Sequence, residues 1–156
     1  MIKLTRVDHR LLHGQIAFSW TSDQNADCIL IANDAVVKDD LRKTTLKLAK
    51  PAGCKLVIKN IDDSIRAVNS GVTDKYRLLI VVESIADAKR LMDGVPAIRS
   101  LNLGGTKASA DTRQISKAMN ITNQDSEDLK SLIDRGIEVE IRMLPGDKKI
   151  MAADVI

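Results

Sequence analysis

The sequence predicts an α/β fold, an open and mainly parallel sheet with helices on both faces and one antiparallel edge strand. Short β-branched apolar runs alternate with amphipathic stretches over short connections, which is the pattern of βαβ units. The runs 28–32 and 77–83 are almost continuously apolar, as strands covered on both faces should be. The stretch 111–122 has β character with no helix beside it, so we expect it to be irregular or an antiparallel excursion at a sheet edge.

The expected elements follow from apolar spacing and from stop signals. The strands are 2–7, 28–32, 55–60, 77–83, 100–104 and 138–144, and the helices are 14–24, 37–50, 61–71, 84–94 and 123–136. Ser84 has the side chain of an N-cap, at the start of the fourth helix. Gly71, Gly94 and Gly136 end the last three helices, and Pro51 closes the second.

Length and composition indicate one globular domain, residues 1–156, that needs no disulfide or metal to fold. Its aromatic residues are Phe18, Trp20 and Tyr76, too few for the stacking platforms of single-stranded nucleic-acid binding. The net charge of +3 is mild, so we expect no nucleic-acid partner. Phe18 and Trp20 are interpreted as packing residues of the first helix.

Cys28 and Cys54 stand far apart in apolar surroundings, which favours buried free thiols over a disulfide or a metal pair. The chain starts without an apolar signal core and has no run of 18 apolar residues. We therefore expect a cytosolic protein that neither crosses a membrane nor is exported.

Loops that follow parallel strands open at one edge of the sheet, where ligands collect near the switch in strand order. The loop after the first strand lies within "RVDHRLLHGQ", residues 6–15, which holds two arginines, two histidines, an aspartate and a glycine. The other strand-end loops carry Asn33 and Asp34, Glu83 and Ser84, and "GGT" at 104–106. We expect these loops to lie near one another but assign no catalytic role to Asn33, Asp34 or Ser84.

His13 directly precedes Gly14 and the start of a helix, so its imidazole can lie beside unpaired N–H groups that favour an anion. Arg10 and Arg6 can approach the same point, and a guanidinium offers a fork that matches a phosphoryl group. Asp8 can anchor one of these arginines. A neutral imidazole there could attack phosphorus while the donors hold the phosphoryl oxygens.

A structural interpretation stands beside this one, because a lone loop histidine is more often a hydrogen-bonded structural residue, and His9 is assigned to that class. The stretch "LGGTKAS" lacks the GxxxxGK[ST] spacing, so a P-loop is not supported. Taken alone, the spacing indicates an anion-binding loop and leaves covalent chemistry open.

The stretch Ile2–Trp20, "IKLTRVDHRLLHGQIAFSW", resembles the start of the IIB components of the bacterial phosphotransferase system, in the mannose/sorbose/fructose group. Their pattern is close to "RIDxRLIHGQVxxxW", with the last histidine as the phosphorylation site. The residues that match in register are Arg6, Asp8, Arg10, Leu11, His13, Gly14, Gln15 and Trp20. The likeness continues through 32–43, 101–107, 113–122 and 135–145, so it covers nearly the whole chain.

The resemblance implies a phosphocarrier that takes a phosphoryl group from the phosphohistidine of a IIA partner onto His13. It then passes the group to a sugar that enters through the membrane components IIC and IID. Arg10 would hold the phosphoryl group, with Arg6, Gly14 and Gln15 as further phosphate-binding residues and Asp8 in support. The resemblance implies no metal or cofactor, and a cytoplasmic place at the inner membrane face through these partners. Two other hypotheses are a non-enzymatic phosphate-binding or regulatory module and a sensor that is phosphorylated without sugar transfer.

Overall fold

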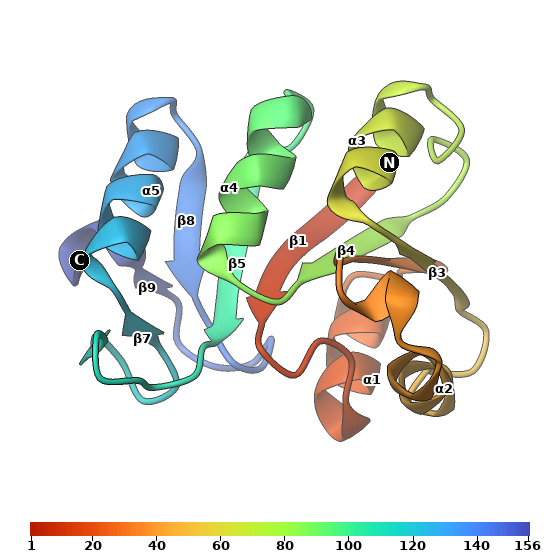
Figure 1. Ribbon diagram of the computed structural model, residues 1–156, viewed down its shortest axis with the longest axis horizontal. Coiled ribbons are helices and arrows are strands. Elements are labelled where there is room, and N and C mark those ends of the chain that lie inside the picture. The colour runs from red at the N-terminus through yellow and green to blue at the C-terminus, as the bar shows by residue number, and fades with distance from the viewer.

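The computed structural model describes residues 1–156 and contains a seven-stranded sheet in the order β3-β2-β4-β1-β5-β8-β9 (Figure 1). The strands are β1 (Ile2–Asp8), β2 (Cys28–Ala32), β3 (Lys55–Lys59), β4 (Leu78–Val82), β5 (Ser100–Gly105), β8 (Glu138–Ile141) and β9 (Ile150–Met151). All neighbouring pairs are parallel except the edge pair of β8 and β9. The predicted fold class is confirmed.

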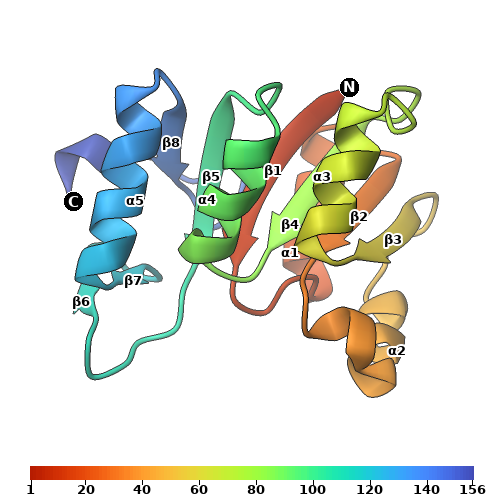
Figure 2. The same cartoon turned by 45° about the horizontal axis from the view of Figure 1, so that its top comes forward.

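Helices cover both faces of the sheet, as Figures 1 and 2 show. Helices α1 (Gly14–Asp23) and α2 (Asp40–Leu48) lie on one face, and α3 (Ile61–Asn69), α4 (Ile85–Gly94) and α5 (Asn123–Asp134) lie on the other. The sheet therefore separates two hydrophobic clusters, a larger one under α3, α4 and α5 and a smaller one under α1 and α2. Strands β2 and β4 are buried along their whole length, which explains their continuous apolar sequence.

The stretch 111–122 joins no edge of the main sheet. It contains β6 (Arg113–Gln114) and β7 (Asn120–Ile121), which pair only with each other as a small antiparallel hairpin. Thr106 ties this hairpin to the end of β5, because its Oγ1 accepts the Asn120 N–H at 2.8 Å. The antiparallel edge strand of the main sheet is β9, from a C-terminal segment for which the sequence predicted no strand.

Two elements differ from the predicted ranges by three or more residues at one end. The stretch 37–50 is divided into a 3-10 turn, η1 (Val36–Lys38), and α2, because the side chain of Asp39 caps α2 by accepting the Arg42 N–H at 3.1 Å. Strand β8 ends at Ile141, and the chain turns just beyond it, where the Arg142 side chain donates to the Pro145 carbonyl at 2.9 Å. Ser84 caps α4, as predicted.

Cys28 and Cys54 are both buried free thiols, as predicted. Burial raises the pKa of each thiol above its ordinary value, so both stay in the protonated, unreactive form at neutral pH. None of the helices combines the length and the apolar character needed to span a bilayer.

Helix α5 begins with a reciprocal cap, which generates a stability prediction. Thr122 Oγ1 accepts the Asp125 N–H at 3.0 Å, and the Asp125 carboxylate accepts the Thr122 N–H at 3.0 Å. Thr122→Ala should therefore lower the free energy of unfolding by about 1 kcal/mol. Thr44→Ala, at an exposed position inside α2, is the control and should change it by less than about 0.5 kcal/mol in the same urea titration. Equal values for the two variants would contradict the prediction.

Candidate active site

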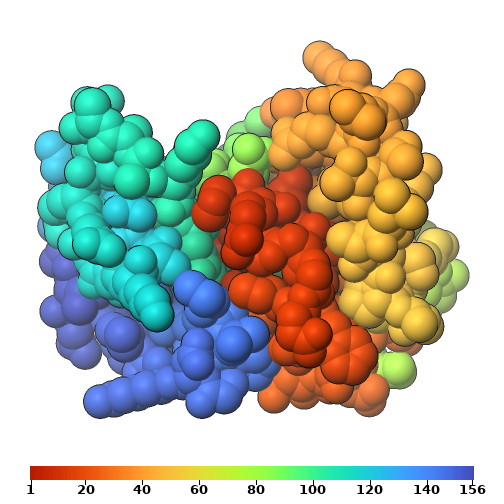
Figure 3. Space-filling view, turned by 90° about the horizontal axis from the view of Figure 1, so that it is seen from below, coloured from red at the N-terminus to blue at the C-terminus, as the bar shows by residue number.

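Strand β1 lies in the middle of the sheet and delivers its loop, residues 9–13, to the centre of the carboxyl-end edge. Figure 3 looks onto this edge, where the first segment of the chain lies between the segments around α2 and around β6 and β7. The Leu11 N–H donates to the Asp8 carbonyl at 2.8 Å, which closes a turn, and Leu11 has a left-handed φ of 60°. Leu11 and Leu12 are buried in the core under α1 and α2. This burial holds the loop in its strained form.

His13 is the N-cap residue of α1. The first bond of the helix runs from the Ala17 N–H to the His13 carbonyl at 3.2 Å, so the N–H groups of Gly14, Gln15 and Ile16 have no partner within the protein. Gly14 adopts a φ of 42° at this corner, which favours glycine. The imidazole is partly exposed, with 21% of its surface accessible. An imidazole and three unpaired amides thus lie at one helix end, an arrangement that favours an anion.

Asp8 fixes the state of the imidazole. Its Oδ2 lies 3.0 Å from His13 Nε2, and its Oδ1 accepts the Arg10 backbone N–H at 3.0 Å. A carboxylate can only accept, so a neutral His13 carries its proton on Nε2 and keeps the lone pair of Nδ1 free. The geometry therefore leaves Nδ1 as the ring nitrogen with a free lone pair.

Arg6, expected to bind phosphate, is instead turned into the protein and 3% exposed. Its guanidinium makes four hydrogen bonds, to Asn102 Oδ1, Asp8 Oδ2 and the carbonyls of Arg142 and Met143. Its Cζ also lies 5.2 Å from the centre of the Trp20 ring, within the range of a cation–π contact. Burial lowers the pKa of Arg6, and Asp8 opposes this shift. All these partners belong to the interior, so the guanidinium is not directed at a ligand beside His13.

Arg10 has the opposite environment. Its side chain is exposed at the tip of the turn and makes no hydrogen bond or ion pair within the protein. The structure thus brings His13, Arg10 and the helix-end amides to the surface and places Arg6 and Asp8 beneath them.

The comparison with known sequences decides the family. The family model described as the PTS system sorbose subfamily IIB component matches residues 2–156. This chain belongs to that family. The IIB chain is 33% identical to the sorbose-specific EIIB component of Lacticaseibacillus casei over 147 residues, which are 94% of this chain and 90% of that protein. It is also 33% identical to the mannose-specific EIIAB component of Escherichia coli K12 over 156 residues, all of this chain and 48% of that protein. It therefore spans about half the length of the EIIAB relatives.

Solved structures agree with the fold. The IIBSor domain of the sorbose permease from Klebsiella pneumoniae superposes with a TM-score of 0.93 at 27% identity, covering 99% of the IIB chain and 94% of that domain. The structure of manxB from Thermoanaerobacter tengcongensis gives a TM-score of 0.93 at 26% identity, with coverages of 99% and 94%.

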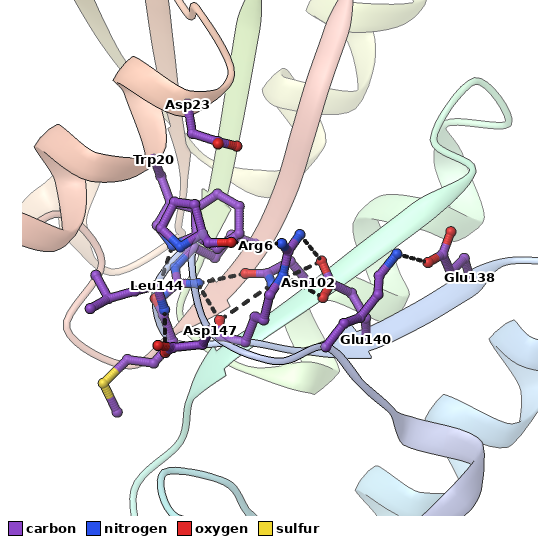
Figure 4. Close-up of polar contacts among 12 residues, drawn as sticks. Arg6, Trp20, Asp23, Asn102, Glu138, Glu140, Leu144 and Asp147 are labelled. Carbon is purple, nitrogen blue, oxygen red and sulfur yellow. Dashed lines mark hydrogen bonds and ion pairs between the residues drawn. The ribbon is translucent and has the colours of Figure 1, made fainter.

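Sequence reasoning missed the residues that surround Arg6. Asn102 and Glu140 are buried polar residues on β5 and β8, and Arg142 lies just beyond β8. Figure 4 shows Arg6, Asn102 and Glu140 joined by hydrogen bonds beside Trp20. The available signal was a polar residue inside an apolar strand, Asn102 in "SLNLG" and Glu140 in "EVEIRML".

The remaining strand-end residues make no hydrogen bond or ion pair with the His13 side chain. Glu83 and Ser84 line a separate polar pocket with His9, whose Nδ1 is shielded and unpaired. Asn33 donates to Glu83 at 2.6 Å, and Asp34 accepts from Arg90 at 2.6 Å. These contacts tie the neighbouring loops together.

Trp20 is a packing residue, as predicted, with 1% exposure. The same prediction for Phe18 is wrong, because 56% of its surface is exposed. The face of α1 that carries Phe18 is turned away from the sheet.

Gly104 allows Arg6 to lie across β5. A Cβ at Gly104 would stand 2.1 Å from Arg6 Cζ and Nη2, so Gly104→Ala should displace the guanidinium and lower the free energy of unfolding by about 1–3 kcal/mol. The fluorescence of Trp20, the single tryptophan, should change with it. Gly146→Ala, where a Cβ meets nothing within 4 Å, should alter neither quantity; unchanged fluorescence and stability in Gly104→Ala would contradict the placement of Arg6.

Proposed function

We propose that the IIB chain is a phosphocarrier of a sugar phosphotransferase system, with His13 as the residue phosphorylated by a IIA partner. The group would then pass to a sugar as the sugar enters through IIC and IID, with this chain at the cytoplasmic face of the membrane. Membership of the family supports this function. The observation that carries it is the imidazole of His13, held by Asp8 through Nε2, with Nδ1 free at a helix end that has three unpaired amides.

Transfer onto His13 would follow an in-line displacement. The Nδ1 lone pair attacks the phosphorus of the donor phosphohistidine, the Nδ1–P bond forms, and the N–P bond to the donor breaks with its electron pair returning to the donor imidazole. The ring of His13 then carries phosphate on Nδ1 and a proton on Nε2, which makes it formally cationic. The Asp8 carboxylate, 3.0 Å from Nε2, stabilises this charge.

The phosphoryl oxygens would be held by the amides of Gly14 and Gln15 and by Arg10. These amides are fixed by the helix, whereas the Arg10 side chain has no competing partner and can close over the group. Arg6 acts beneath them by neutralising Asp8. Positioning and charge stabilisation supply the catalysis in this proposal.

The second step reverses the first. A sugar hydroxyl attacks the phosphorus, the Nδ1–P bond breaks, and His13 returns to the neutral ring with its proton on Nε2. The hydroxyl proton passes to a base on the permease. Because the same imidazole faces two partners in turn, each docking would be transient and use the exposed surface around Arg10 and His13.

Incubation with phosphorylated IIA tests the proposal. The IIB chain should gain one phosphoryl group, on His13, and His13→Ala should gain none. Phosphorylation of His13→Ala to the wild-type level would refute the assignment. Binding of phosphate without a covalent product would favour a regulatory module, and a phosphorylated chain that gives nothing to a sugar would favour a sensor.

The role of Arg10 gives a kinetic prediction. Arg10→Lys keeps the charge but loses the two-pronged donor, so phosphoryl transfer should slow by roughly 10-fold or more, measured by quenched-flow labelling. The free energy of unfolding should change by less than about 0.5 kcal/mol, because the side chain is exposed. Arg66→Lys, at an exposed site on α3, is the control; a wild-type transfer rate in Arg10→Lys would count against Arg10 as a phosphate ligand.

A further inference from the structure

We propose that Asn102 is a positioning residue which, through Arg6 and Asp8, determines which ring nitrogen of His13 accepts the phosphoryl group. The inference rests on the proposed function for its kinetic consequence, whereas its effect on the unphosphorylated imidazole can be measured independently. It assigns a task to a buried polar residue that lies far from His13 in the sequence.

The sheet register brings the relevant side chains together. Arg6 on β1 is the register partner of Asn102 on β5, and Asn102 is the register partner of Glu140 on β8. Side chains at matched positions of adjacent parallel strands project to the same face. The three residues therefore form a polar row across the sheet, on the face covered by α1, at 3%, 1% and 6% exposure respectively.

Each member of this row orients the next. The Arg142 guanidinium donates from Nε to Glu140 Oε2 and from Nη2 to Glu140 Oε1, each at 2.9 Å. The Asn102 amide nitrogen donates to Glu140 Oε1 at 3.3 Å and to the Arg142 carbonyl at 3.4 Å. Because the amide nitrogen is committed on that side, Asn102 Oδ1 faces Arg6 and accepts from its Nη1 at 2.5 Å. The row thus selects one of the two flip states of the amide.

The row ends at the atom that sets the tautomer. Asp8 Oδ2 accepts from Arg6 Nη2 at 3.3 Å and faces His13 Nε2 at 3.0 Å. If Arg6 turned away, this carboxylate, 4% exposed, would lose the guanidinium that orients it and would rotate from its place. Nε2 would then lose its acceptor, and the ring proton could move to Nδ1, whose lone pair would no longer be free.

An effect of Asn102 on the imidazole can be distinguished from an effect on folding, because Arg6 has other partners that keep it in place. The carbonyls of Arg142 and Met143 accept from the same guanidinium at 3.0 and 3.1 Å, and Trp20 packs on it. Loss of the Asn102 acceptor should therefore leave Arg6 buried but change the direction of its Nη2 group. We expect an effect on the imidazole that exceeds any effect on folding.

The test uses nitrogen NMR of the His13 ring in the whole IIB chain, at a pH where the ring is neutral. The wild type should show the Nε2–H tautomer, and Asn102→Leu, similar in shape but without an acceptor, should show a mixture of tautomers. Asn102→Gln, which keeps an amide oxygen for Arg6 and an amide nitrogen for Glu140, should restore the single tautomer. Leu103→Val, a buried change on the same strand, is the control for packing loss and should keep the wild-type spectrum.

Phosphorylated IIA then supplies the kinetic readout. Asn102→Leu should accept the group roughly 10-fold more slowly and should carry part of it on Nε2, whereas the wild type and Leu103→Val carry it on Nδ1. If Asn102→Leu does not fold, Asn102→Ala, which also lacks an acceptor, provides the same comparison. A folded variant without the Asn102 amide that keeps the wild-type tautomer and rate would overturn the inference, whereas absent phosphorylation of the wild type would refute only the proposed function.

Discussion

The ion pair between Arg6 and Asp8 is the interaction on which the site depends. Two charges at 3% and 4% side-chain exposure are costly to bury, and such a pair is maintained only where its remaining hydrogen-bonding groups are satisfied. Here a second ion pair, between Glu140 and Arg142, lies close to the first. The Trp20 ring packs against the guanidiniums of Arg6 and Arg142. The charges of these two ion pairs balance within the cluster.

The backbone contributes the second constraint, since it fixes where the imidazole stands. Strand β1 is held between β4 and β5, and its loop is anchored by Leu11 and Leu12 in the core. The strained φ of Leu11 and the positive φ of Gly14 turn the chain so that His13 becomes the first residue of the α1 cap. A loop held in this way would need little further ordering to bind a phosphoryl group. In this sense the site is preorganised.

The sequence was sufficient to predict features that depend on residues close together in the chain. Apolar runs located the sheet, and Gly14 after His13 located the start of α1, because both depend on neighbouring residues. That this helix end binds an anion stays a prediction. The position of the Arg6 side chain could not be found in this way, since its partners Asn102 and Met143 follow 96 and 137 residues later and approach it only in the folded sheet. The short strand β9 was not predicted for a similar reason. Its two residues carry too little pattern, and tertiary contacts decide whether they join the sheet. Phe18 was misplaced because its apolar character alone does not say which helix face meets the core.

The division between exposed and buried groups suits the proposed function, in which this chain receives and then surrenders the same phosphoryl group on His13. Groups that touch phosphate must also fit two different partners, so they gain from being at the surface and, in the case of Arg10, unpaired and mobile. Groups that set the proton on the ring must act identically in both half-reactions, so they gain from burial, where no docking partner can displace them. The IIB chain places Arg10 and the α1 amides in the first class and Asp8, Arg6 and Asn102 in the second. His13 is the one side chain that belongs to both, with Nδ1 available to the phosphoryl group and Nε2 held from inside.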